Sequence, residues 1–526
     1  MRDLAVLQRR LAPVWRLSRP PGGAAHVRVV LPSYNLGASA HEHYARRLPA
    51  LEHRFLVDIL QLARVEGCTM LFVLSQAPEA EVIDYYLSLL PEEVAAGVRD
   101  RVHVVVVPEQ SARPLAAKLR DRPDLLAGIR HFVGDRPVFI EPWNVTENEV
   151  AVAVALGAPL NGTAPQLLPL GFKSAGRRIF AAAGVPSPPG AEDVRTAGDV
   201  QAAIDRLREE HPALESVVVK LDNSVAGVGN LVIPLRDPDG TTSPAATVSE
   251  RVASMPDWYL DELRDGAVVE AYVTADRCSS PSVQLEVTPD HRAVVLATHE
   301  QVLGGENGQV YLGCRFPASR DYATRLTTYG RRIGEQLAAR GALGLLSVDF
   351  AAACPDGERW ALYALEVNLR RGGTTPPMVV LSSLLPGRID GGGRWRLPDG
   401  SSRFYAATDN LLDPHWVGLP VSRVIDAVRS GGSAFDRRTG TGVVLHMLSG
   451  IAIDGRFGLT AIGRSAEEAG EMLGSVGPVV NRLCEATAPD GVASQEDPRF
   501  GGNRPDDRPS ERTLTGWPRL DPVAQG

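Results

Sequence analysis

Two carboxylates and one amide in the chain are spaced so that they could hold a metal ion. Strand-like apolar runs lie on either side of a Pro-Asp-Gly-Glu turn at 355–358, so the chain is expected to fold back there. That hairpin brings Asp349 close to Glu366, and Asn368 shares a face with Glu366 because alternate strand residues point the same way. Such oxygen clusters suit Mg²⁺, which completes its shell with phosphate oxygens and water. A solvated strand face is the alternative interpretation.

A lysine followed by small residues indicates a contact with phosphate. Lys220 ends the apolar run that begins at Ser216, and Ser224, Gly227 and Gly229 follow it closely. Small residues allow backbone N–H groups to approach phosphate oxygens, and a lysine beside them adds positive charge. The segment is not a P-loop, because the GxxxxGK[ST] pattern is absent. An ordinary β-turn would have the same composition.

Two other segments carry a weaker signal. Lys173 opens a segment with helical spacing, where a lysine on the helix surface would be ordinary. Glu270, Tyr272 and Val273 close another strand-like run, and backbone groups there could bind the edge of an adenine base. Neither segment predicts a nucleotide-binding site by itself. Their order along the chain is what makes them informative.

Composition and charge limit the class of partner. Apolar residues make up 44% and charged residues 22% of the 526 residues, and the net charge of −8 disfavours non-specific binding to nucleic acid. Five cysteines without a CxxC pattern predict neither a disulfide framework nor a zinc site, and favour a reducing cytoplasm. No apolar stretch has the length of a signal-peptide core or a membrane span. We therefore expect a cytoplasmic protein that binds neither nucleic acid nor membrane, with a homo-oligomer as an open alternative.

The elements that must position these residues fall into three regions and a tail. Strand-like runs alternate with helical spacing over 1–160, which predicts a Rossmann-like α/β domain around a mainly parallel sheet. Over 161–380 the strands alternate apolar and polar residues more clearly, which predicts an antiparallel α+β domain. Residues 381–488 are expected to form a further α/β domain, and 489–526, rich in Pro, Asp, Arg and Gly, a disordered tail.

The order of the chemical features resembles the ATP-grasp superfamily. A lysine opens a helix that ends in GVPSP, a strand ends in lysine before a glycine-rich loop, a later strand ends in Glu-x-x-Val, and a VDF…EVN hairpin closes the series. The resemblance covers about 161–380 and implies that ATP binds between two α+β lobes. It makes 161–380 the expected ATP-grasp domain and 1–160 the expected pre-ATP-grasp domain.

The resemblance also implies roles for individual residues. Lys173 and Lys220 would contact the ATP phosphates and the base region. The implied phosphate loop contains Ser224, Gly227 and Gly229. The implied adenine site contains Glu270, Tyr272 and Val273. The implied Mg²⁺ site contains Asp349, Glu366 and Asn368. Mn²⁺ would substitute for Mg²⁺ at such a site.

A narrower similarity, to the pheganomycin-type peptide ligases, reaches over most of 27–485. The segments that carry it are PWNVTENE at 142–149, VVVKLDNSVAGVGN at 217–230, GQVYLGCRFPAS at 308–319, EVNLRRGGTTPP at 366–377, ATDNL at 407–411 and FDRRTGTGVVLHML at 435–448. In that group a further domain follows the ATP-grasp domain. The similarity implies an ATP-dependent ligase that joins an amino-acid carboxylate to the amino group of a peptide or amino acid. The implied route is an acyl phosphate with release of ADP and phosphate, in specialised-metabolite or antibiotic biosynthesis.

Two positions depart from the pattern of D-alanine ligase-like members. Ser347 stands where those members have an arginine, two residues before the metal-binding aspartate, and Arg277 stands where they have an acid for the ribose. The cation that stabilises the transition state is therefore expected at Arg315, Arg370 or Arg371. Two alternatives stay open: a nucleotide-binding pseudoenzyme that acts as a scaffold, and a ligase whose acceptor is a polyamine or a hydroxyl group.

Overall fold

The computed structural model describes residues 2–20, 22–36, 41–42, 44–109, 111–224, 229–236, 245–304, 310–355 and 357–487. Contacts divide the chain into one compact unit, Met1–Cys484, and a second unit, Glu485–Gly526. The predicted tail at 489–526 and the predicted phosphate-loop residue Gly227 lie outside the described residues. Within the described ranges, no helix is both long and apolar enough to cross a membrane.

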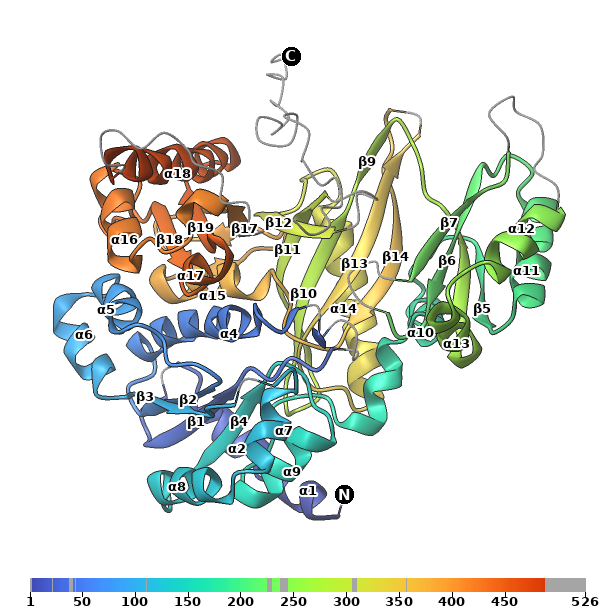
Figure 1. Cartoon of the computed structure of the whole chain (residues 1–526). Helices are drawn as coiled ribbons and strands as arrows, with labels where there is room; N and C mark the ends of the chain where they lie inside the picture. Colours follow the sequence, from blue (N-terminus) through green and yellow to red (C-terminus); the bar gives the residue numbers. More distant parts are fainter. Residues whose placement is uncertain are drawn as a thin grey trace, which may run out of the picture. The chain divides into compact units, whose positions relative to one another are not determined.

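The N-terminal region is a parallel sheet with helices on both faces, as its alternating pattern predicts (Figure 1). The sheet has the order β3-β2-β1-β4, with β1 His26–Leu31, β2 Cys68–Leu74, β3 Val102–Val106 and β4 Val138–Pro142. Because side chains alternate along a strand, Val30 and Phe72 join one core cluster while Val29 and Leu71 join another. The helices are α1 Arg2–Gln8, α2 Leu11–Leu17, α4 Leu48–Glu52, the 3-10 helix η1 His53–Ala63, α5 Ala80–Ser88, α6 Glu92–Arg99, α7 Leu115–Arg120, α8 Pro123–Val133 and α9 Glu147–Leu156.

A small antiparallel lobe follows, preceded by η2 Pro165–Gly171 and α10 Lys173–Ala182. Its sheet has the order β5-β8-β6-β7, with β5 Gly190–Val194, β6 Ser216–Leu221, β7 Asn230–Pro234 and β8 Ala267–Ala271. One face packs on α11 Ala197–Glu210, α12 Ala245–Ala253 and α13 Asp257–Asp265. Val217, Val219 and Leu221 enter that core, so the strand period of two turns Val218 and Lys220 to the opposite face.

The predicted hairpin lies at one edge of a large antiparallel sheet, which is eleven-stranded in the described part of the chain. Its first strands are β9 Arg277–Ser279, β10 Pro281–Val287, β11 Ala293–Gly304, β12 Val310–Phe316, β13 Gly344–Cys354 and β14 Ala361–Asn368. Helix α14 Ala323–Ala339 covers β10 and β11 and buries Leu326 and Ile333 against Val283 and Leu285. The path β14-β13-β10-β11-β12 then continues into the C-terminal region.

The C-terminal region extends this same sheet. Strand β17 Ser402–Leu412 pairs with β12 on one side and with β19 Arg456–Gly463 on the other, and β18 Gly442–His446 pairs with β19. The short strands β15 Arg388–Ile389 and β16 Trp395–Arg396 complete the path. The helices here are α15 Thr375–Leu384, η3 Pro414–Trp416, α16 Val421–Ser430, α17 Gly450–Asp454 and α18 Ala466–Thr487.

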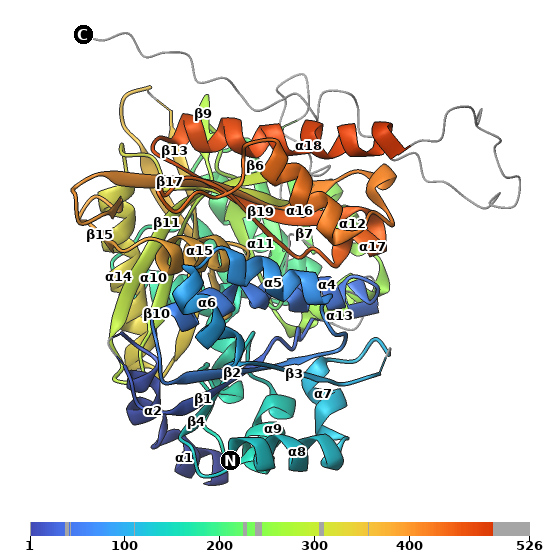
Figure 2. The same ribbon diagram turned by 90° about the vertical axis from the view of Figure 1, so that its left-hand side faces the viewer.

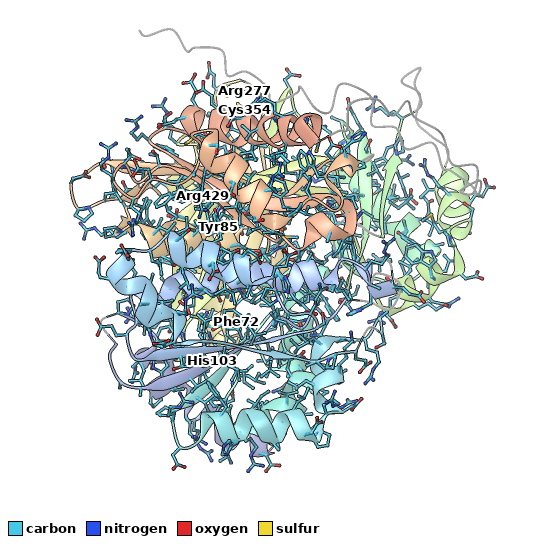
Figure 3. All side chains as sticks on the ribbon, turned by 60° about the vertical axis from the view of Figure 1, so that its left-hand side comes forward. Phe72, Tyr85, His103, Arg277, Cys354 and Arg429 are labelled. Atoms are coloured by element: carbon cyan, nitrogen blue, oxygen red, sulfur yellow. The ribbon has the colours of Figure 1, made fainter. Side chains whose placement is uncertain are left out.

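The N-terminal helices pack directly against the C-terminal region (Figure 2). The hydroxyl of Tyr85 on α5 accepts the backbone N–H of Leu445 at 2.8 Å. Arg429 on α16 donates to Ser88 Oγ at 3.0 Å, and Figure 3 shows Tyr85 and Arg429 on these neighbouring elements. The first and third regions are therefore in contact with each other as well as with the second.

Candidate active site

Residues from all three regions line one cavity of about 730 Å³. The sequence-predicted residues on its wall are Lys173, Lys220, Ser224, Glu270, Tyr272, Val273, Asp349, Glu366, Asn368, Arg370 and Arg371. Arg315 and Gly229 are not on that wall. The fold thus gathers side chains from distant parts of the sequence around one space.

The hairpin of β13 and β14 places its polar residues side by side. Asp349 pairs with Glu366 and Ser347 pairs with Asn368 across the two strands. Asn368 Nδ2 donates to Asp349 Oδ2 at 2.9 Å, and Gln301 Nε2 donates to Asp349 Oδ1 at 2.9 Å. The register shifts directly after Asp349, and bulges of this kind re-aim side chains near functional sites. Two carboxylates and an amide therefore meet at the cavity.

The electrostatics of this group favour a bound cation. Burial raises the pKa of Asp349 to about 7 and the charge of Glu366 adds to the rise, while Arg370 opposes it. Burial lowers the pKa of Arg370, and the two carboxylates act against that lowering. Carboxylate and amide oxygens are the ligands that Mg²⁺ takes at nucleotide sites, and an ion there would relieve the repulsion between the carboxylates. The donor set fits a divalent cation.

Lys173 is fixed at the start of α10 by the segment that follows β6. Asp222 caps this helix, because its Oδ1 accepts the N–H of Ser174 at 2.8 Å and its carbonyl accepts the N–H of Lys173 at 3.3 Å. Lys173 Nζ donates to Ser224 Oγ at 3.0 Å and lies 3.6 Å from Glu366 Oε1. The buried ammonium therefore stands between the loop after β6 and the carboxylates, where a phosphate chain would meet both.

Glu270 orients Lys220. The carboxylate of Glu270 is 1% exposed and accepts Lys220 Nζ at 2.7 Å and Arg177 Nη1 at 2.8 Å. Burial acts to raise the pKa of Glu270, but Lys220 and Arg177 together hold it below its ordinary value. Since this side chain serves the lysine, contacts of the strand with an adenine base would come from its main chain and from Tyr272 and Val273.

Arg370 and Arg371 have different surroundings. Arg370 lies over the Trp143 ring, 5.3 Å from its centroid, and beside the hairpin carboxylates. Arg371 donates to both oxygens of Asp58 on η1, at 2.8 and 2.9 Å, and is 4% exposed. Arg370 is thus a charged group beside the hairpin carboxylates, whereas Arg371 belongs to a buried ion pair.

Three positions discussed from the sequence are not among the residues that line the cavity. Arg315 is on β12, between β11 and β17, and burial lowers its pKa. Gly229 has φ +85°, and a Cβ there would come within 2.7 Å of Leu221 Cδ1, so this glycine shapes the approach to β7. Arg277 lies over the Trp360 ring, 5.0 Å from its centroid. The structure therefore gives these three residues no place on the cavity wall.

Sequence reasoning missed the wall that the first and third regions contribute. Arg54 Nη2 on η1 lies 2.6 Å from Asp409 Oδ2 on β17, and His446 Nε2 lies 2.7 Å from Asp409 Oδ1. Arg456 on β19 donates to Asn410 Oδ1. The sequence could have indicated three of these residues. Asp409, Asn410 and His446 fall within ATDNL and VVLHML, which belong to the segments that resemble the peptide ligases. Arg54 and Arg456 lie in segments without a distinctive pattern.

A second cavity of about 480 Å³ shares Arg371 with the first. Glu141 and Glu286 are on its wall, together with Arg28, which joins Arg371 in binding Asp58. Neither lysine of the first cavity and none of the hairpin's polar residues line it. The candidate chemistry therefore belongs to the larger cavity.

Family models match two parts of the chain. A model described as "IQCH-like, ATP-grasp" matches residues 245–381, and one described as "PGM1 C-terminal domain" matches residues 423–475. The chain is 32% identical over 425 residues to the L-propargylglycine–L-glutamate ligase of Streptantibioticus cattleyicolor. That alignment covers 79% of this chain and 85% of the relative.

Solved structures share the fold at low identity. The ADP complex of N5-carboxyaminoimidazole ribonucleotide synthetase aligns with a TM-score of 0.52 and 13% identity, over 87% of this chain and 98% of that one. The biotin carboxylase domain of Hydrogenobacter thermophilus 2-oxoglutarate carboxylase, solved with the magnesium salt of ADP, aligns with a TM-score of 0.51 and 13% identity, over 86% and 89%. These likenesses show the architecture of a parallel N-terminal sheet followed by antiparallel lobes.

Proposed function

This chain belongs to the ATP-grasp amino-acid ligases, and we propose that it joins an amino-acid carboxylate to the amino group of an amino acid or peptide through an acyl phosphate. The observation that carries the proposal is the shared cavity in which two lysines, an arginine and the Asp349, Glu366 and Asn368 oxygens meet. Phosphoryl transfer needs these parts, namely positive charge along the phosphates and oxygen ligands for a divalent ion.

The first step transfers the γ-phosphoryl group of ATP. A carboxylate oxygen of the donor attacks the γ-phosphorus, and the bond from that phosphorus to the β-phosphate oxygen breaks to release ADP. Lys173 and Lys220 hold the phosphates by charge, and Glu270 keeps Lys220 in place. Arg370 stabilises negative charge on the transferred group, the task that an arginine performs at the position of Ser347 in related ligases.

The hairpin residues hold the metal ion. Asp349, Glu366 and Asn368 would bind Mg²⁺, which when bound neutralises charge on the phosphates. Gln301 and Asn368 each donate a hydrogen bond to Asp349, so the carboxylate has a defined orientation before any ion arrives.

The second step forms the new carbon–nitrogen bond. The amine of the acceptor attacks the acyl carbon, the bond from that carbon to the phosphate oxygen breaks, and the nitrogen loses one proton as phosphate leaves. Burial of the site between three regions matters here, because water that reached the acyl phosphate would hydrolyse it.

The substrate class follows the relative. The relative is named as a ligase of L-propargylglycine and L-glutamate, and the 32% identity covers most of both chains, which supports amino-acid substrates here. Propargylglycine is not one of the amino acids of ordinary proteins. We therefore place this chain in the biosynthesis of a specialised metabolite, with an antibiotic as one such product.

An activation assay tests the proposal. The protein is incubated with Mg-ATP, a pool of amino acids and short peptides, and hydroxylamine as a general amine, and ADP, AMP and hydroxamates are measured together. We expect ADP and hydroxamate in equal amounts, because hydroxylamine traps the acyl phosphate. AMP with hydroxamate would mean adenylation and would contradict the mechanism. ATP binding without any product would point to a scaffold.

A further inference from the structure

Three arginines from the first and third regions share the cavity with the hairpin residues. Arg47 precedes α4, Arg54 lies on η1 and Arg456 opens β19, and we call these three the arginine cluster. Their side chains are 40%, 15% and 17% exposed. Charges that are partly withdrawn from water interact more strongly with a ligand than fully solvated charges do.

Among the residues that the structure describes, two aspartates compensate the arginine cluster incompletely. Asp409 Oδ2 lies 2.6 Å from Arg54 Nη2, and Asp454 Oδ2 lies 2.8 Å from Arg47 Nε and 3.4 Å from Arg456 Nε. Three guanidinium groups therefore share two carboxylates in these ion pairs. Arg54 Nε is buried and, across the part of the chain that the structure describes, has no hydrogen-bond partner. In these ion pairs the cluster keeps an excess of positive charge.

The arginine cluster adjoins the reacting end of the cavity. Arg370 lies over the ring of Trp143. The Trp143 ring packs on Tyr34, with ring centroids 4.8 Å apart. Tyr34 and Arg54 are both close enough to Arg370 to act on its charge. A continuous wall thus runs from Arg370 to Arg54. A molecule with an anionic group at Arg54 could place its amine beside Arg370.

We propose that the arginine cluster binds the free carboxylate of the acceptor substrate, so that the acceptor is an amino acid or a peptide. The proposal rests on the proposed function, since it assigns the second substrate of that reaction. The donor carboxylate reacts at the hairpin and the ATP phosphates take the lysines, which leaves the remaining positive charge for the other substrate. Guanidinium groups bind carboxylates through two parallel hydrogen bonds, and a polyamine would be repelled.

Substitutions in the arginine cluster test this assignment. Arg54→Gln and Arg456→Gln should each raise KM for the acceptor by about 10- to 100-fold, the range expected for losing a hydrogen bond to a charged group. KM for ATP and KM for the donor should stay near those of the wild type, and any change in kcat should be smaller than the change in the acceptor KM. Arg54→Lys, which keeps the charge beside Asp409, should recover part of the loss. Arg331→Gln, an exposed position on α14, is the matched control.

Pairs of acceptors that differ only in the carboxylate test how much this group contributes to binding. Each amino acid or dipeptide is supplied as the free acid and as the primary amide, with putrescine as the polyamine. The wild type should use the acids with a higher kcat/KM than the amides. Arg54→Gln should reduce the ratio of kcat/KM for the acid to kcat/KM for the amide. Equal use of acids and amides by the wild type, a preference for putrescine, or a rise in the donor KM instead of the acceptor KM would overturn the assignment.

A thermal-stability measurement makes the test independent of turnover. Amino acids should raise the melting temperature of the wild type more than their amides do, and this preference should vanish in Arg54→Gln. Equal stabilisation by acids and amides would overturn the inference even if ADP were formed. A preference for acids without any ADP would leave the carboxylate site standing and would count against the proposed ligase reaction.

Discussion

Arg370 and Arg371 are adjacent in sequence but belong to different networks. The RR pair after EVN suggests positive charge near the metal site, and nothing in the pair distinguishes its members. The distinction comes from Asp58, which binds Arg371 from 313 residues away in the chain. Local spacing predicted Asp349, Glu366 and Asn368 as a group because one short turn brings them together. It could not predict a partner that only the tertiary fold supplies.

Substitution of each arginine should separate their roles. Arg370→Gln should lower kcat by about 100-fold or more while the protein unfolds at a near-normal temperature, because the loss falls on the transition state. Arg371→Gln should lower the free energy of unfolding by about 3–5 kcal/mol, because it leaves Asp58 buried and undercompensated. Steady-state kinetics and urea unfolding of both variants provide the comparison. The reverse pattern would exchange the two assignments.

The carboxylates of the hairpin should be essential for turnover without being essential for folding. Glu366→Gln removes a charge from a side chain that is 30% exposed, so stability should change little, whereas ADP formation should fall by about 100-fold or more. Asp349→Asn should behave in the same way. Glu335→Gln, on the exposed face of α14, serves as the control. Turnover at the wild-type rate in Glu366→Gln would remove the metal assignment.

At the scale of elements, local patterns predicted the second region well. The apolar run from Ser216 to Lys220 lies on β6, and the strand-like runs on either side of the turn at 355–358 are β13 and β14. Strand β17 was missed, because its partners β12 and β19 lie far from it in sequence and because Asp409 and Asn410 have low strand propensity. The helical spacing predicted within 1–160 includes the 3-10 helix η1, where Phe55, Ile59 and Leu62 are buried.

Glu270 on β8 binds Arg177 on α10, and this contact should stabilise the small lobe. Glu270→Ala leaves Lys220 and Arg177 in a buried site without their shared carboxylate, so the free energy of unfolding should fall by about 3–5 kcal/mol. Glu192→Gln touches the same arginine through a side chain that is 33% exposed, and its cost should be under about 1 kcal/mol. Urea unfolding measures both values. Equal costs would mean that Glu270 is not the anchor.

At the scale of the molecule, the three regions meet around one cavity, and ion pairs between them fix its walls. Asp58 of the first region binds Arg371 that follows the hairpin, and Asp409 of the third binds Arg54 of the first. Composition and strand pattern predicted the three types of region. They gave no information about which surfaces meet, because contacts between distant segments leave no periodic trace in the sequence. The boundaries near 160 and 380 stay predictions.

Asp58 should make the free energy of unfolding fall as the pH becomes acidic. Burial acts to raise its pKa, but Arg371 and Arg28 hold it below the ordinary value of 3.8. The ionised form is therefore favoured in the folded state, so its contribution is complete above about pH 4 and is lost as pH falls through the folded pKa. Asp58→Asn should be less stable near neutral pH and should lose less stability on acidification. Urea unfolding across that range, with exposed Asp426→Asn as control, decides the point.

The central claim is that the donor carboxylate attacks the γ-phosphorus of ATP, and an oxygen-18 transfer experiment tests it most directly. The donor amino acid is labelled with oxygen-18 in its reacting carboxylate, and the products of one ligation are analysed by mass spectrometry. We predict that one labelled oxygen appears in the released inorganic phosphate and none in the nucleotide, since the acyl phosphate keeps the donor oxygen on phosphorus. Label in AMP, or phosphate without label, would contradict the account.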